Sequence, residues 1–214
     1  MSKMSLSTRM ILALTLITLL SGAILAGWDS FTKPKVEFHR QEALKKAIAE
    51  VLPAHDHYET IESEDITLYL ARSGEMKSLI GIAFQAAGSG FQGEVRIMVG
   101  AEPGFENLTG IKVLEQIETP GLGTKIVDDP SNKDNPLWWP EQFNGIATRP
   151  EIVVLKNATP SAPNEIQGIT GATITSKAVA QIIGKDLERA REVFDSIEDA
   201  GANLYGIIKT EKED

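Results

Sequence analysis

The feature that most constrains this chain is an apolar run without charge near its beginning, from Met10 to Trp28. A helix rises about 1.5 Å per residue, so a run of this length just crosses a hydrocarbon core of roughly 30 Å. Trp28, at the end of the run, is typical of a residue anchored at a membrane interface. The sequence therefore predicts one transmembrane helix over residues 10–28.

A cleaved signal peptide is the competing interpretation, because Ser21-Gly22-Ala23 could form a small-residue cleavage site. The apolar run continues past that site, which favours a retained anchor. Lys3 and Arg9 precede the run without an acidic residue, and this favours a cytoplasmic N-terminus. A plain count of the basic residues after the run favours the opposite orientation. Long domains cross membranes largely regardless of such counts, so charge alone leaves the orientation open.

The remaining sequence is long enough for one domain of ordinary size. A helical pattern from Phe38 to Leu52 is closed by Pro53 and is expected to lead from the membrane to this domain. Short β-like runs follow, separated by turn residues: Ile66–Ala71, Leu79–Ala87, Glu94–Val99, Ile111–Ile117 and Ile152–Leu155. After Gly168, apolar residues recur at helical spacing: Val179, Ile182, Ile183, Leu187, Ala190 and Phe194.

This order predicts an α+β fold, with a mainly antiparallel sheet and a long C-terminal helix behind one transmembrane helix. The expected division is a cytoplasmic tail (1–9), the transmembrane helix (10–28), a connecting helix region (29–60), the folded domain (61–200) and a C-terminal tail (201–214). The last residues, Lys209–Asp214, are almost wholly charged and are expected to fray.

Composition excludes several classes of function. The formal net charge of −9 argues against nucleic acid as a partner. The chain has no cysteine, which excludes disulfides, thiolate-held iron–sulfur clusters and thiol catalysis. Any redox role must therefore rest on a bound organic cofactor. His55-Asp56-His57 could suggest a metal, but the segment follows Pro53 in a polar stretch, so we favour a solvated loop.

The segment Gly168–Ser176 contains four hydroxyl residues, two glycines and no charge, directly before the periodic helix. One interpretation is a helix cap entered through a glycine turn. The other is an anion site, because free backbone N–H groups and the positive end of a helix dipole attract phosphate. The segment matches neither the three-glycine nucleotide pattern nor a P-loop. The residues alone leave both interpretations open.

A resemblance to a known family adds to this interpretation. Thr170-Gly171-Ala172-Thr173-Ile174-Thr175 resembles the Ser/Thr-Gly-Ala-Thr-x-Thr motif of the FMN-binding domain found in Rnf-type electron-transport proteins. The same motif occurs in the C subunit of the sodium-pumping NADH:quinone reductase. Glu118–Lys125 is locally a turn, and it resembles the Glu-Thr-Pro-Gly-Leu-Gly loop of the same family. Gly88–Gly93 and Leu137–Phe143 are weaker matches, so the resemblance extends over about residues 88–194.

The resemblance implies that FMN is joined covalently, through its phosphate, to the hydroxyl of the last threonine, Thr175. The rest of the expected cofactor-binding set around this threonine is Gly171, Ala172, Thr173, Ile174 and Ser176. For the flavin ring, the expected contacts are Thr119, Leu122 and Gly123, with Glu118 and Lys125 supplying nearby charge. Glu118 as a turn acceptor and Lys125 as a solvated turn residue are the alternatives.

A threonine hydroxyl is a poor nucleophile without a nearby base, and no Ser-His-Asp order is evident near Thr175. Self-attachment is therefore not expected. The resemblance implies a separate flavin transferase that moves FMN from FAD to a threonine that the domain must expose. Trp138 and Trp139 could relay electrons, but tryptophans of this kind more often serve as core or interface anchors.

Taken together, these motifs resemble those of the G subunit of the Rnf (Rsx) ion-translocating complexes. The resemblance implies an electron carrier with covalent FMN, in a complex that couples electron transfer between ferredoxin and NAD to proton or sodium movement. It also implies partners among the other subunits and membrane lipid, an inner-membrane location and a domain on the periplasmic side. Alternatives are the C subunit of the quinone reductase, an anchored envelope binding domain without cofactor, and a free-standing FMN reductase module.

Overall fold

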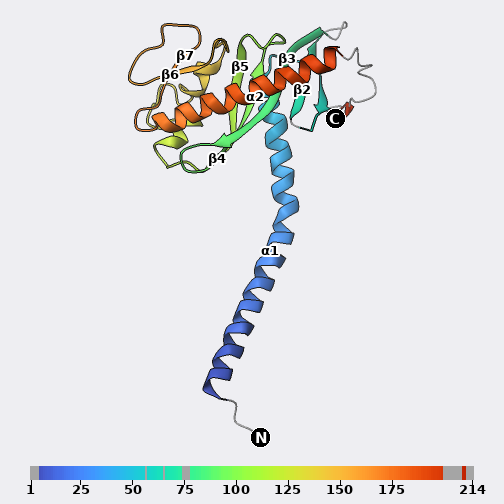
Figure 1. The fold of residues 1–214 in the computed structure, drawn as a ribbon, viewed down its shortest axis with the longest axis vertical. Helices are drawn as coiled ribbons and strands as arrows, with labels where there is room; N and C mark the ends of the chain where they lie inside the picture. Colours follow the sequence, from blue (N-terminus) through green and yellow to red (C-terminus); the bar gives the residue numbers. More distant parts are fainter. Residues whose placement is uncertain (1–4, 56, 65, 74–77, 200–208, 211–214) are drawn as a thin grey trace. The chain divides into compact units, whose positions relative to one another are not determined.

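The computed structural model describes residues 5–55, 57–64, 66–73, 78–199 and 209–210. The chain divides into two compact units, Met1–Ala43 and Leu44–Asp214. The second unit combines a mainly antiparallel sheet with a long helix near the C-terminus, so the predicted α+β class is confirmed (Figure 1).

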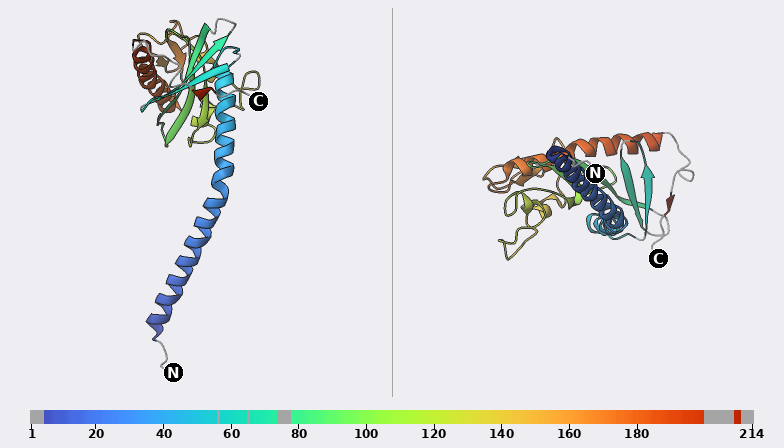
Figure 2. Two further views of the ribbon diagram at one scale, coloured as in Figure 1. Left: turned by 90° about the vertical axis from the view of Figure 1, so that its right-hand side faces the viewer. Right: turned by 90° about the horizontal axis from the view of Figure 1, so that it is seen from below.

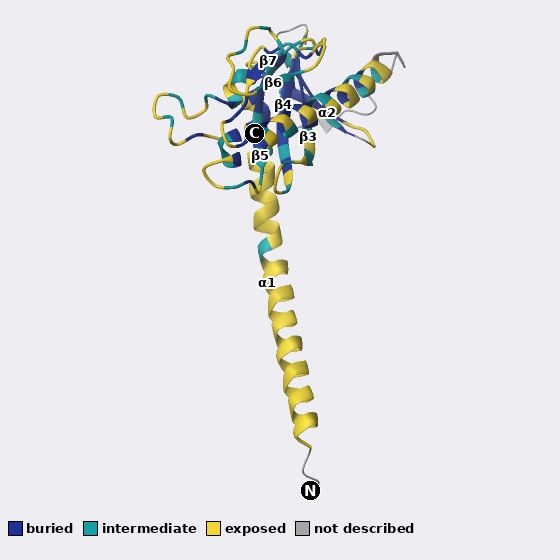
Figure 3. Cartoon of the chain, turned by 60° about the vertical axis from the view of Figure 1, so that its left-hand side comes forward, coloured by how far each residue is buried: buried dark blue, intermediate teal, exposed yellow. Residues whose placement is uncertain are grey.

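Helix α1 (Leu6–Val51) forms the described part of the first unit and continues into the second. It is the one helix among the described residues that is long and apolar enough to span a membrane. Its apolar side chains before Leu44 are exposed, as the yellow ribbon in Figure 3 shows. The helices expected at 10–28 and 38–52 form one continuous helix that contains Pro34. Asp29 and Lys33 form an exposed ion pair at 2.8 Å within it.

The sheet of the second unit has the strand order β5-β4-β3-β2-β1-β8, with every neighbouring pair antiparallel. Its strands are β1 (His57–Glu62), β2 (Thr67–Ser73), β3 (Ser78–Ser89), β4 (Glu94–Ala101), β5 (Leu108–Glu115) and β8 (Lys209–Thr210).

Three sequence expectations for this sheet need correction. No strand was expected at β1, whose residues 57–60 fall in the expected connecting region and 61–62 in the expected domain, because its six residues show no regular alternation of apolar and polar side chains. Strand β5 begins and ends earlier than the predicted Ile111–Ile117. In the tail, Lys209 and Thr210 pair with Thr60 and Glu59 rather than fraying, while residues 211–214 lie outside the described part.

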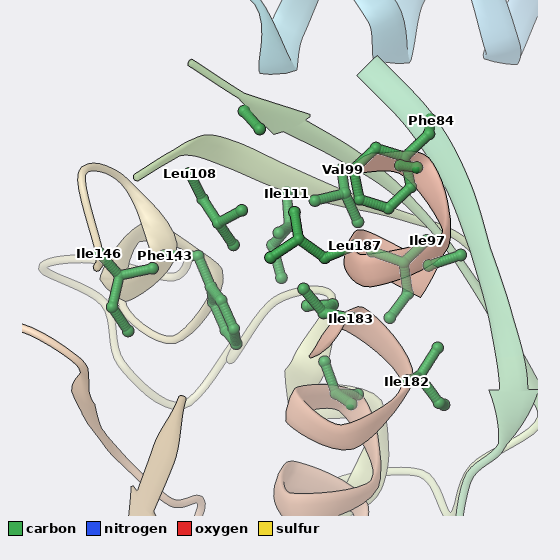
Figure 4. Packing of buried hydrophobic residues seen from close by; sticks show 14 of the residues in the cluster. Phe84, Ile97, Val99, Leu108, Ile111, Phe143, Ile146, Ile182, Ile183 and Leu187 are labelled. Carbon is green, nitrogen blue, oxygen red and sulfur yellow. The ribbon is translucent and has the colours of Figure 1, made fainter. Parts of the chain in front are cut away.

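Helix α2 (Thr173–Asp199) crosses one face of the sheet, as Figures 1 and 2 show. Alternate residues of β4, namely Val95, Ile97 and Val99, belong to the same buried cluster as Ile183 and Leu187 of α2. Figure 4 shows Ile97 and Val99 of β4 close to Ile183 and Leu187 of α2 in the core. The periodic apolar face predicted from the sequence is therefore the face that α2 buries.

The opposite face of the sheet is covered by the end of α1. Ala47, Ile48 and Val51 form a second buried cluster with Tyr69 of β2 and Met98 of β4. The sheet is thus buried on both faces, which explains why its strands are rich in apolar residues at successive positions.

Outside the main sheet, β6 (Val153–Leu155) and β7 (Glu165–Gln167) form a small parallel pair. Two short 3₁₀ helices, η1 (Gly123–Ile126) and η2 (Pro140–Phe143), lie between β5 and β6 in the chain. Trp139 is fully buried, and its indole N–H donates to the backbone carbonyl of Gln167 at 3.0 Å. This tryptophan is a core anchor that supports the segment leading into α2.

Candidate functional site

The threonine-rich segment forms a tight turn into the first turn of α2. Gly168 N–H donates to the Leu155 carbonyl at 2.8 Å, which ties the start of the segment to β6. Gly171 has φ +83°, a backbone conformation that residues other than glycine rarely adopt. Ser176 closes the turn, because its hydroxyl accepts from Ile169 N–H and donates to the Ala172 carbonyl, both at 3.0 Å.

The first intrahelical bond of α2 runs from Ser176 N–H to the Ala172 carbonyl at 3.0 Å. Thr173, Ile174 and Thr175 precede Ser176 in the first helical turn, where backbone N–H groups have no intrahelical acceptor. The glycine turn into a helix is therefore present, but the residue at the cap position is Ala172 and not a hydroxyl residue. The helix start presents backbone donors at the positive end of the helix dipole, and the anion site stays a prediction.

Glu118 meets Thr175 across 57 residues of sequence. The Thr175 hydroxyl donates to Glu118 Oε2 at 2.8 Å. The other carboxylate oxygen, Oε1, accepts the backbone N–H groups of Phe91 at 2.7 Å and Gln92 at 3.0 Å. Glu118 is 5% exposed and Thr175 2% exposed. The carboxylate is thus fixed from both sides in a buried position.

Gly123 makes room for this carboxylate. A Cβ atom placed at Gly123 would lie 2.5 Å from Glu118 Oε2, which is closer than real Cβ contacts come. Gly123 begins η1, so the turn that follows β5 passes directly beside the Glu118 side chain. A side chain at position 123 would push the carboxylate away from Thr175.

Around this contact lies a cavity of about 390 Å³, within the range of roughly 300–1,000 Å³ typical of small-molecule sites. Most of its lining comes from the loop after β3, the turn after β5 and the start of α2. The lining residues are Phe91, Glu118, Thr119, Leu122, Gly123, Lys156, Gly171, Ala172, Thr173, Ile174 and Thr175.

Nine of the residues expected at the cofactor site line this cavity, and two do not. Ser176 is fully buried and holds the turn into α2, so its contribution is structural. Lys125 points away from the cavity, because its ammonium group pairs with Asp129 at 3.1 Å and donates to Ser131 at 3.2 Å.

Asp129 is a buried acidic group that this arrangement stabilises. A hydrogen bond from Ser131, followed by those from Lys125 and Trp138, lowers the pKa of Asp129 from 3.8 to about 2. Its carboxylate thereby stabilises the loop between η1 and Trp138. Lys125, expected to supply charge near the flavin, instead supports this loop.

Two lining residues, Phe91 and Lys156, were not singled out from the sequence. Phe91 is exposed and follows Gly90 in the loop between β3 and β4. Lys156 is exposed and follows β6. The glycine-rich segment around Phe91 was a usable signal, since it is one of the weaker family matches. No local pattern marks Lys156, because only the fold brings β6 beside the start of α2.

The donor set of this cavity fits FMN. Phe91, Leu122 and Ile174 are exposed apolar side chains on its wall and suit a flat aromatic ring. The N-terminal turn of α2 and the ammonium group of Lys156 suit a phosphate. Leu122 also lies against Gly171, where an added Cβ would be 3.1 Å from its Cδ2 atom.

The expectation that Thr175 is exposed is wrong for this structure. The residue is 2% exposed, and its hydroxyl donates to Glu118. Thr175 still lines the cavity.

Comparison with known proteins agrees with this geometry. A family model described as an FMN-binding domain matches residues 90–188, which include every cavity residue. The chain is 36% identical over 160 residues to the G subunit of the Na(+)-translocating ferredoxin:NAD(+) oxidoreductase complex of Acetobacterium woodii, covering 70% of each protein. The chain belongs to the G-subunit family of ion-translocating oxidoreductase complexes. This confirms the resemblance to the Rnf-type proteins.

A second G subunit also matches this chain. The chain is 25% identical over 183 residues to the G subunit of the ion-translocating oxidoreductase complex of Methanosarcina acetivorans, covering 82% of this chain and 90% of the relative. Among solved structures, the C subunit of the Na(+)-translocating NADH-quinone reductase from Parabacteroides distasonis is similar with a TM-score of 0.46 and 18% identity. That match covers 68% of this chain and 79% of the other.

Proposed function

We propose that this protein is a membrane-anchored electron carrier whose FMN is joined through its phosphate to the Thr175 hydroxyl. The observation that carries the proposal is the position of Thr175 in the first turn of α2, on the wall of a cavity within the FMN-binding domain. FMN supplies one- and two-electron transfer when bound, in a chain that has no cysteine to hold a cluster.

Different residues of this chain would bind the phosphate and the ring of FMN. The N–H groups at the start of α2 and Lys156 would hold the phosphate, and Gly171 would let the backbone approach it closely. Phe91, Leu122 and Ile174 would contact the flavin ring. Thr119 is held in place, because its hydroxyl accepts a hydrogen bond from the side-chain amide of Gln92 at 2.7 Å.

We further propose the setting in which this carrier works. The relative from Acetobacterium woodii is named as part of a ferredoxin:NAD(+) oxidoreductase that translocates sodium. By analogy, this chain carries electrons between neighbouring subunits of such a complex, and the complex couples that transfer to ion movement. Helix α1 anchors it in the inner membrane through residues 10–28, with residues 1–9 in the cytoplasm and the FMN-binding domain, placed at 61–200, on the periplasmic side.

Attachment needs a partner enzyme, a flavin transferase that supplies FMN from FAD. The test is mass spectrometry of the full chain, expressed with and without such a transferase. We expect an added FMN phosphoester on the peptide containing Thr175, only when the transferase is present. Thr175→Val should abolish the adduct, while the matched control Thr170→Val, at an exposed residue outside the cavity lining, should keep it. An unmodified Thr175 peptide in cells with an active transferase would refute the proposed linkage.

A further inference from the structure

The contact between Glu118 and Thr175 has a chemical meaning beyond cofactor binding. A threonine hydroxyl becomes a useful nucleophile only when a nearby base takes its proton. The sequence around Thr175 offers no such base. The fold supplies one, because Glu118 Oε2 accepts the Thr175 hydroxyl proton in a hydrogen bond of 2.8 Å. This distance lies within the range of about 2.6–3.2 Å required of a general base.

We propose that Glu118 is the general base that takes the proton of Thr175 while the FMN phosphoester forms. This inference rests on the proposed attachment of FMN to Thr175. It places part of the catalytic machinery for attachment in the acceptor protein itself. The flavin transferase then has to deliver and activate the flavin donor, while the acceptor brings its own base.

The surroundings of Glu118 fit this role. Its two carboxylate oxygens have separate partners, since Oε1 accepts the Phe91 and Gln92 amides and Oε2 faces Thr175. The amides hold the carboxylate in one orientation, so little reorganisation is needed when the proton moves. Gly123 leaves the space that this orientation requires.

The step balances in atoms and charge. Thr175 Oγ1 attacks the phosphorus on the riboflavin side of FAD, the dinucleotide that the transferase supplies. The Oγ1–P bond forms, the bond from that phosphorus to the bridging pyrophosphate oxygen breaks, and AMP leaves with the oxygen and its electron pair. The proton moves from Oγ1 to Glu118 Oε2, which becomes a neutral carboxylic acid. No oxidant or reductant takes part.

The experiment measures the rate of FMN attachment to the full chain in detergent, with purified transferase and FAD. Glu118→Gln keeps the size of the side chain and an acceptor for the loop amides, but it cannot take a proton. We expect its kcat to fall about 100-fold or more, in line with the range of roughly 10²–10⁴ for general-base catalysis. Its KM for the acceptor chain should stay near that of the wild type. The matched control Glu151→Gln removes an exposed charge outside the cavity and should attach FMN at the wild-type rate.

A kcat for Glu118→Gln within about threefold of the wild type would overturn the proposal, and so would a loss confined to a raised KM. The thermal unfolding midpoint shows whether this variant folds. If it does not fold, Glu118→Asp decides, because it keeps the base but withdraws it from Thr175. Attachment at the wild-type rate in Glu118→Asp would then overturn the proposal. If the wild type itself is not modified at Thr175, the proposed function fails, which is a distinct result.

Discussion

The packing of α2 against β3 can be tested with two glycines that sit in opposite environments. At Gly88 of β3, an added Cβ would lie 2.7 Å from Ile182 Cγ1 and 3.2 Å from its Cδ1. Ile182 is 6% exposed, and its branched side chain has one preferred rotamer in a helix, so it has little room to move. Gly88→Ala should therefore force α2 away from the sheet.

The expected magnitude follows from two opposing terms. Overpacking a filled site costs about 1–3 kcal/mol, and replacing a strand glycine regains about 0.5–1 kcal/mol of backbone entropy. The midpoints of these two ranges lower the free energy of unfolding of Gly88→Ala by about 1.3 kcal/mol, within extremes of about 0–2.5 kcal/mol. For a unit of this size, the midpoint corresponds to a melting temperature lower by about 3–5 °C.

Gly184 of α2 provides the matched control. An added Cβ there meets no atom within 4 Å, so Gly184→Ala should raise stability by about 0.5–1 kcal/mol through helix propensity alone. The assay is thermal unfolding of the full chain in detergent, followed by circular dichroism. If Gly88→Ala melted at or above the wild-type temperature, the tight contact between Ile182 and β3 would be refuted.

Three further predictions concern the loop and the cavity. The pKa of Asp129 is about 2 in the folded chain and 3.8 when unperturbed, so its stabilising contribution is complete above about pH 4 and lost as pH falls through about 2. Acid unfolding of Asp129→Asn should therefore depend less on pH in that window, and an unchanged dependence would contradict the assignment. Trp139→Phe loses the indole bond to the Gln167 carbonyl and some buried volume, so denaturant titration should show a loss of about 1–3 kcal/mol. Lys156→Gln should weaken noncovalent FMN binding about two- to fivefold, as expected for an exposed ion pair, and leave riboflavin binding unchanged in fluorescence titration. Equal losses for both ligands would remove Lys156 from the phosphate site.

The sequence was sufficient wherever one segment contains its own signal. The apolar run Met10–Trp28 lies within the membrane-competent helix, since continuous apolarity needs no partner to be recognised. The spacing of Ile183 and Leu187 predicted the buried face of α2, because helical periodicity is local. Strand β1 was not predicted, because its six residues show no regular alternation of apolar and polar side chains and are recognised as a strand only by their pairing with β2.

The candidate site shows the same difference between signals within one segment and contacts that depend on the fold. The glycine and hydroxyl pattern from Gly168 to Ser176 predicted a helix start suited to phosphate, and the structure has that helix start. Within the pattern, however, sequence could not separate Thr175, which lines the cavity, from Ser176, which holds the turn. Their side chains differ in direction by one helical step of about 100°, and only the packing of α2 decides which step faces the cavity.

By itself, then, the sequence determined the membrane-competent helix, the α+β class and the two motifs typical of FMN binding, because each depends on residues that are close together in the sequence. Only the tertiary structure decided that Glu118 faces Thr175, that Lys125 pairs with Asp129 instead, and that Lys156 reaches the cavity. Such contacts join residues that only the folded chain brings together. They depend on strand register and on the position of α2 over the sheet, which arise from the burial of the whole core rather than from any single segment.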